Sequence, residues 1–171
     1  MNSPHLYGKY KWGLFSFGFF QYLRKNWTET GKYGRIQKTK RGSDMKLIVC
    51  LDKQNGMLFN HRRQSRDRMV IADILETVGD AVLWVSAYSA RLFPAERVRI
   101  CTQLPAGTED YCFAEDRLPD ELPQELTVYR WNRVYPADTF FPLQLSQWKQ
   151  ISFEEFVGFS HEIIAKECYV K

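Results

Sequence analysis

Short runs of hydrophobic residues, separated by polar turns, fill residues 45–171. The run at 46–51 contains β-branched residues and is typical of a buried strand, and the Asp-Lys-Gln-Asn-Gly sequence at 52–56 is typical of a turn. From residue 65 onward, apolar positions recur at nearly helical spacing: Met69, Ile71, Ile74, Leu75 and Val78. Gly79 follows as a C-cap, so the pattern predicts a helix over about 65–78.

The rest of this region alternates between strand-like runs and turns. The pattern predicts strands at 81–85, 98–102, 111–113, 126–135 and 163–169, a short helix at 86–92 and a loop at 114–125. Strands alternate with helices early and follow one another late, which is typical of an α/β protein. We therefore expect a single mixed sheet flanked by helices, in one domain of residues 45–171. The 44% apolar content of the 171-residue chain is enough for one core.

Residues 1–44 differ in composition from this domain. They hold nine Lys or Arg against Glu29 and Asp44, a balance of +7, so residues 45–171 carry −3 of the total formal charge of +4. Residues 12–22 are aromatic and apolar but fall short of the ~20 residues that span a bilayer, so we expect no membrane insertion. We expect this basic aromatic leader to be disordered, or not natively translated if translation begins at Met45. The alternative is that residues 12–22 dock on a membrane or on the domain.

The cysteines and histidines show no metal-ligand spacing. The four cysteines form no C-x-x-C pair, and the three histidines lie far apart in the sequence. We expect free thiols, no metal site and a cytoplasmic location. Because the excess of basic residues belongs to the leader, the charge does not favour nucleic acid as a partner.

Several segments, in the same order along the chain, resemble one known family. Residues 45–52 lead into Asn-Gly and Met-Leu-Phe-Asn at 55–60, and residues 81–85, 99–108 and 126–129 follow. The last are Asp-Thr-Phe-Phe-Pro at 138–142, Trp148 and the terminal run at 160–171. Together they resemble dihydrofolate reductase, with Ala137 replacing the glycine of the family's G-D-T-x-F-P loop. The resemblance implies a shortened dihydrofolate reductase-like fold over most of residues 45–171.

Three departures from the family bear on function. Gln64 stands where the resemblance places the acid that protonates the substrate, and an amide cannot release a proton near neutral pH. Asp67 could take that role only if the helix register differs. The family's G-R-x-T element, which holds NADPH phosphates, corresponds to residues 85–89, and these lack the arginine. The glycine-rich cofactor turn has no counterpart, and only 18 residues separate Gly107 from Leu126, too few for the family's extra helix, strand and helix.

If the chain binds a ligand without reductase chemistry, these departures imply that it uses no cofactor. NADPH belongs to the alternative of a divergent reductase. The hydroxyls left to hold NADPH in that case are those of Ser86, Ser89 and Thr102.

One polar cluster lies at the start of the expected helix. Its candidate ligand-binding residues are Asn60, Arg62, Arg63, Gln64 and Arg66. If the helix begins early, Arg62 and Arg66 share a face and could hold a phosphate or carboxylate by forked hydrogen bonds. Otherwise the cluster is a solvated helix start.

A second cluster lies in the expected strand at 126–135, where Arg130 and Asn132 are candidate ligand-binding residues. Alternation places Val128 and Arg130 on one face and Trp131 on the other. Either Arg130 lines a pocket, or the segment is an exposed edge strand whose arginines stack on Trp131 and pair with the acidic loop. We interpret His161 as a polar strand residue, and no catalytic residue is assigned.

We interpret the chain as a divergent dihydrofolate reductase-like protein that binds an anionic small molecule, nucleotide or pterin-like, without ordinary reductase chemistry. The alternatives are a divergent NADPH-dependent reductase and, because of the arginine cluster, an RNA-binding or RNA-processing protein. The chain also resembles short bacterial proteins loosely labelled ribonuclease Z. That enzyme class needs a histidine-rich two-metal site, which three separated histidines cannot build.

Overall fold

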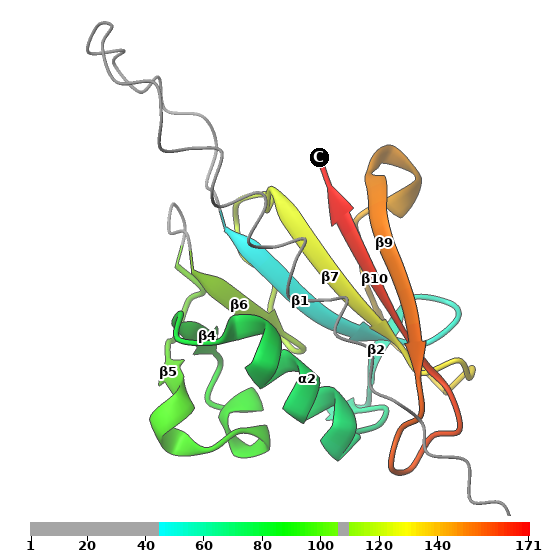
Figure 1. The fold of residues 1–171 in the computed structure, drawn as a ribbon, viewed down its shortest axis with the longest axis horizontal. Coiled ribbons are helices and arrows are strands. Elements are labelled where there is room, and N and C mark those ends of the chain that lie inside the picture. The colour runs from blue at the N-terminus through cyan, green and yellow to red at the C-terminus, as the bar shows by residue number, and fades with distance from the viewer. Residues whose placement is uncertain (1–44, 106–109) are drawn as a thin grey trace, which may run out of the picture. The chain divides into compact units, whose positions relative to one another are not determined.

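A seven-stranded mixed sheet forms the centre of the domain. The computed structural model describes residues 45–105 and 110–171, so the expectations for the leader lie outside the described residues. The strand order is β5-β4-β6-β1-β7-β10-β9, with β1 beside β6 and β7 (Figure 1). The strands are β1 (Lys46–Leu51), β4 (Leu83–Val85), β5 (Val98–Ile100), β6 (Tyr111–Ala114), β7 (Glu125–Arg130), β9 (Lys149–Phe156) and β10 (Ile164–Val170). The five strands from β5 to β7 run parallel, and β10 is antiparallel to both of its neighbours, so the predicted mixed sheet is confirmed.

A small second sheet and one α-helix complete the described fold. The small sheet, in the order β3-β2-β8, was not predicted; its strands are β2 (Gly56–Phe59), β3 (Arg62–Arg63) and β8 (Thr139–Phe140). The helix α2 (Arg68–Val78) lies across the large sheet (Figure 1). Three single 3₁₀ turns are η1 (Ser89–Leu92), η2 (Ala95–Arg97) and η3 (Leu145–Gln147). The predicted short helix at 86–92 is therefore reduced to the turn η1.

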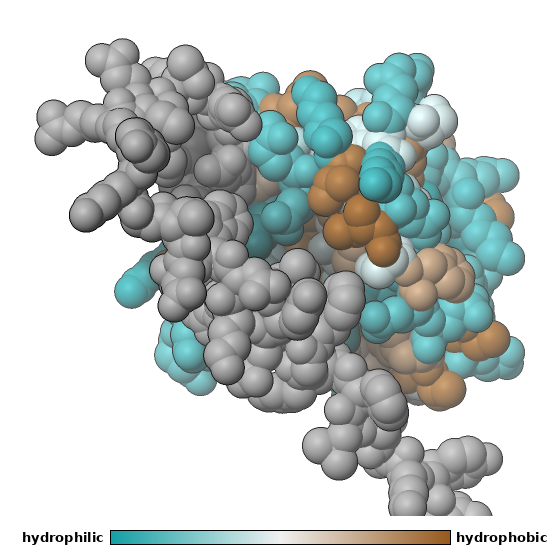
Figure 2. Space-filling view, turned by 45° about the horizontal axis from the view of Figure 1, so that its top comes forward, coloured by the Kyte–Doolittle hydropathy of each residue, from teal (hydrophilic) through white to brown (hydrophobic). Residues whose placement is uncertain are grey.

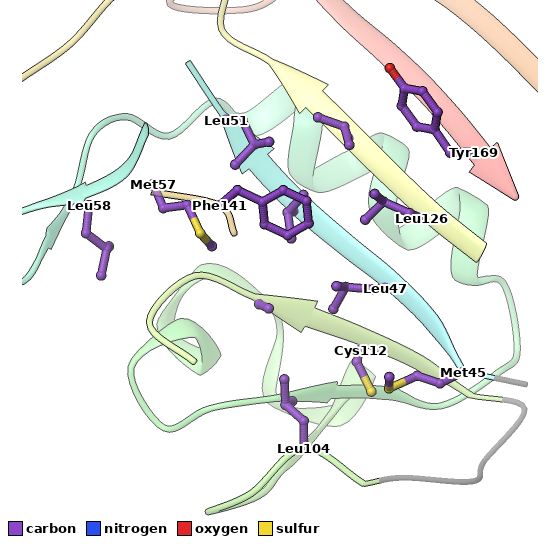
Figure 3. Close-up of a cluster of buried hydrophobic side chains, with 13 residues drawn as sticks. Met45, Leu47, Leu51, Met57, Leu58, Leu104, Cys112, Leu126, Phe141 and Tyr169 are labelled. Atoms are coloured by element: carbon purple, nitrogen blue, oxygen red, sulfur yellow. The ribbon is translucent and has the colours of Figure 1, made fainter. Parts of the chain in front are cut away.

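Alternation along the strands divides the core into two clusters. Leu47 and Leu51 of β1 point to one side, where they belong to the same cluster as Met57 and Phe141 (Figure 3). Val49 is a member of that cluster too. Ile48 points to the other side and belongs to the cluster that contains Val70, Ile74 and Val78 of α2. A strand with both faces covered reads as a continuous apolar run. This explains why residues 46–51 were recognisable from the sequence.

Two predicted elements have different bounds in the structure. The helix begins at Arg68 rather than at 65, because Asp67 is its N-cap and its side chain accepts from the backbone N–H of Met69 at 2.9 Å. The strand predicted at 126–135 ends at Arg130, and Asn132 lies at a φ of 53°, which a continuing strand does not adopt. The interpretation of this segment as an edge strand is wrong, since β7 lies between β1 and β10.

Strand β9 is one of the two edge strands of the large sheet and carries exposed apolar residues. Ile151 and Phe153 are 57% and 56% exposed, and Val157 and Phe159 in the loop after the strand are 72% and 64% exposed. On the face drawn in Figure 2, apolar side chains lie in separate groups among polar ones. Within residues 45–105 and 110–171, none of the helices has the length and apolar content needed to cross a membrane.

Candidate functional site

A cavity of about 280 Å³ lies against the β2–β3 hairpin. It is lined by Phe59, Asn60, Arg62, Arg63, Gln64, Tyr135 and Pro136. Four of the seven predicted ligand-binding residues therefore share one cavity wall. They lie together because Asn60 and His61, both at positive φ, make a two-residue turn that folds β3 back on β2.

Arg63 is held in place by contacts with Tyr88 and Glu115. Its backbone N–H donates to the Tyr88 hydroxyl at 2.7 Å, and its Nη2 donates to the Tyr88 carbonyl at 3.2 Å. The guanidinium lies 4.6 Å from the centre of the Tyr88 ring and 3.2 Å from the carboxylate of Glu115. Arg62 is exposed, and no carboxylate in the described part of the chain lies within ion-pair distance of it. Arg62 thus supplies the uncompensated positive charge of the cavity.

Gln64 is fixed by a buried carboxylate below the cavity. Its Nε2 donates to Asp52 Oδ2 at 3.3 Å and to the Pro136 carbonyl at 3.4 Å. Its Oε1 is buried and has no hydrogen-bond partner among the described residues. Burial opposes ionisation of Asp52, but N–H donors from Tyr135, Gly56 and Gln54 outweigh burial and lower its pKa. Asp52 is therefore an ionised structural group, because its carboxylate is saturated with donors.

The three remaining predicted ligand-binding residues lie away from this cavity. Arg130 donates to Glu167 at 3.1 Å and to the Asn55 side chain at 2.6 Å. Asn132 lines a separate cavity of about 370 Å³. Arg66 lies in the loop before α2 and lines neither cavity. The expectation that Arg62 and Arg66 share a helix face is wrong, since Arg62 is in strand β3.

Two of the three residues predicted for a cofactor, Ser86 and Ser89, lie beside a pair of carboxylates. Ser89 Oγ donates to Glu115 at 2.8 Å, and Ser86 Oγ donates to Asp116 at 2.7 Å. Thr102 is exposed, and its carbonyl accepts from Arg117 at 2.6 Å. Burial raises the pKa of Glu115 above its ordinary value despite the opposing charge of Arg63. The two serine hydroxyls that would bind phosphate thus already donate to acidic groups at the carboxyl end of β6.

A second polar cluster was not recognised in the sequence. His161, interpreted as a polar strand residue, is buried in the loop before β10, and its Nδ1 lies 3.1 Å from Asp67 Oδ2. Its Nε2 lies 3.1 Å from both the Ser65 and the Tyr135 hydroxyls. Asp67 and His161 are 94 positions apart, so no local pattern joins them. The one signal available was the Asp-Arg pair before an apolar helical period, which marks Asp67 as an N-cap.

Comparisons with known proteins agree with this topology. The solved structure of dihydrofolate reductase from Enterococcus faecalis, complexed with NADP(H) and RAB-propyl, is similar with a TM-score of 0.51 over 76% of this chain and 98% of that chain. This chain has a dihydrofolate reductase-like fold. The sequence identity to that dihydrofolate reductase is 11%, so the similarity concerns the fold alone. No protein-family model matches the chain, and neither does any curated protein. Residues 45–105 and 110–171 contain no group of three or more His, Cys, Asp or Glu that could hold a metal ion.

Proposed function

We propose that the domain binds an anionic small molecule, nucleotide-like or pterin-like, in the cavity against the β2–β3 hairpin and does not carry out ordinary reductase chemistry. The observation that carries the proposal is the exposed guanidinium of Arg62 at a cavity whose described lining contains no carboxylate. Arg63 is bound to Glu115, so it shapes the wall, while Arg62 supplies the charge that an anion meets.

The polar groups around the cavity suit a ring that carries both donors and acceptors. Gln64 Oε1 has no partner in the described residues, so a small rearrangement of its amide would let it accept a ligand N–H. Phe59, Tyr135 and Pro136 supply apolar and aromatic surface for a flat ring. A volume of about 280 Å³ is close to the lower end of the usual range for small-molecule pockets and suits a compact ligand.

The missing proton donor separates this proposal from a reductase. The amide of Gln64 cannot protonate a substrate, and the nearby carboxylate of Asp52 is buried and accepts four hydrogen bonds. A divergent reductase that uses NADPH would also have to place phosphates near Glu115 and Asp116. Those carboxylates repel phosphate and already accept the Ser89 and Ser86 hydroxyls.

The test is thermal stability with a panel of nucleoside monophosphates, dihydrofolate, inorganic phosphate and NADPH. The full chain is compared with Arg62→Gln and with the matched control Arg66→Gln. The control removes one arginine charge from the same stretch of chain, at a position that lines neither cavity. The two variants therefore have the same net charge and differ only in where the charge is lost.

We expect at least one of the anionic ring compounds to raise the melting temperature of the full chain and of Arg66→Gln. Affinity for that compound should fall at least about tenfold in Arg62→Gln, because one charge-assisted hydrogen bond is worth about 1.5–3 kcal/mol. Equal affinity for the two variants would contradict the proposed site. Tight NADPH binding with oxidation of the cofactor in the presence of dihydrofolate would favour the reductase alternative instead.

A further inference from the structure

The hydrogen bonds of His161 form a chain from a buried carboxylate to a hydroxyl group. Asp67 Oδ2 lies 3.1 Å from His161 Nδ1, and His161 Nε2 lies 3.1 Å from Ser65 Oγ. The side chains of Asp67 and His161 are 0% and 3% exposed, while Ser65 is partly exposed. A nucleophile within reach of a base that a third group orients is the arrangement expected for nucleophilic catalysis.

Asp67 is ionised and fixed in position. Its carboxylate accepts from the backbone N–H groups of Met69, Phe159 and Ser160 at 2.9, 2.9 and 2.7 Å. Burial opposes ionisation, but these donors and His161 outweigh it, so the pKa of Asp67 lies well below its ordinary value. A carboxylate in this position accepts the proton of His161 Nδ1 in a hydrogen bond, which leaves Nε2 as an acceptor.

Two more side chains contact the imidazole ring of His161, one at its face and one at Nε2. The ring stacks on Trp131 with a centroid distance of 4.8 Å and an interplanar angle of 24°. The Tyr135 hydroxyl lies 3.1 Å from Nε2, and Tyr135 lines the cavity against the β2–β3 hairpin. His161 itself lines the separate cavity of about 370 Å³. The histidine is therefore rigid and adjacent to space that a small molecule can enter.

We infer that Ser65 is the nucleophile of an acyl-transfer site, with His161 as the general base and Asp67 as the positioning residue. The substrate class is a small carboxylic ester. Ser65 Oγ bonds to the carbonyl carbon while its proton passes to His161 Nε2. The bond from that carbon to the alcohol oxygen then breaks, and the alcohol leaves with the proton from Nε2. Water repeats the two steps on the acyl-serine and releases the carboxylic acid.

The test uses the full chain and a neutral fluorophosphonate, which reacts with activated serines without needing an anion site. Labelling is located by peptide mass mapping. We expect the label on Ser65, none in Ser65→Ala, and a rate about 100-fold lower in His161→Gln, which is the smaller end of the effect of a general base. The matched control is Ser146→Ala, which removes an exposed hydroxyl in the turn η3 and should keep the labelling rate within about threefold.

Asp67 needs a measurement that a purely structural role would not change. In Asp67→Asn, the amide donates toward Nδ1 and moves the ring proton to Nε2, and ¹⁵N NMR of the imidazole reports that exchange. Ser65→Cys gives a second test if His161→Gln does not fold: its thiol should react with iodoacetamide about tenfold faster than an exposed cysteine. Absence of label on Ser65, or label on Tyr135 instead, would overturn the assignment. Because the probe is neutral, that result leaves the anion-binding proposal standing.

Discussion

The guanidinium of Arg63 lies 3.2 Å from the carboxylate of Glu115, and this ion pair joins the β2–β3 hairpin to the carboxyl end of β6. The two side chains are 18% and 8% exposed, so removing one leaves the other with a buried charge. We expect Arg63→Gln to lower the free energy of unfolding by about 3 kcal/mol. Urea denaturation measures the change. The exposed neighbour Arg62→Gln should stay within about 0.5 kcal/mol of the natural sequence.

The raised pKa of Glu115 gives a pH dependence of defined sign. Burial raises this pKa from the ordinary glutamate value of 4.5, so above that pH the folded chain keeps a proton that the unfolded chain has lost. The contribution of Glu115 to the free energy of unfolding therefore falls as the pH rises from 4.5 to the raised pKa of Glu115. The unfolding free energy of the natural sequence, measured relative to Glu115→Gln, should decrease accordingly. A relative stability that increases with pH would contradict the assignment.

Asp67 should show the opposite dependence. Its pKa lies below the ordinary aspartate value of 3.8, so its stabilising effect is complete above that pH and is lost as pH falls below it. Acid titration of the unfolding free energy for the natural sequence and for Asp67→Asn checks this. The gap between the two curves should close as pH decreases below about 4.

Gly56 has no room for a side chain. A Cβ there would lie 2.5 Å from Gln64 Nε2 and 2.7 Å from the Cβ of Ala137. We expect Gly56→Ala to destabilise the domain by about 1–3 kcal/mol and to displace Gln64 from the cavity wall. Adding Ala137→Gly to Gly56→Ala should recover part of the lost stability, because it removes one of the clashing atoms. Thermal melting of the natural sequence, the single variant and the double variant would show this. No change in Gly56→Ala would mean that the wall is looser than the structure indicates.

Local patterns predicted the interior of the sheet and the edge strand β5, but not the other edge strand, β9. Residues of β1 and β6 are buried on both faces and form apolar runs that a sequence displays directly. Strand β9 was not predicted, because six of its eight residues are exposed. The strands of the small sheet have two to four residues, too short for a period to be seen.

The candidate site was predictable only where it is contiguous. Asn60, Arg62, Arg63 and Gln64 lie within five consecutive positions, and the turn and β3 bring them to one cavity, which Tyr135 and Pro136 complete. Arg130 and Asn132 are close in sequence, but the end of β7 between them sends one into hydrogen bonds with Glu167 and the other to a different cavity. His161 meets Asp67 through tertiary packing alone, which no spacing rule encodes.

The tight turn at Asn60 and His61 has a consequence for how this region can vary. With only two residues between the strands, the pairing of Phe59 with Arg62 and of Leu58 with Arg63 is fixed. One inserted residue would slide β3 along β2 and turn each arginine to the opposite side of the ribbon. A variant with one residue added to this turn should therefore lose the placement of Arg62 at the cavity.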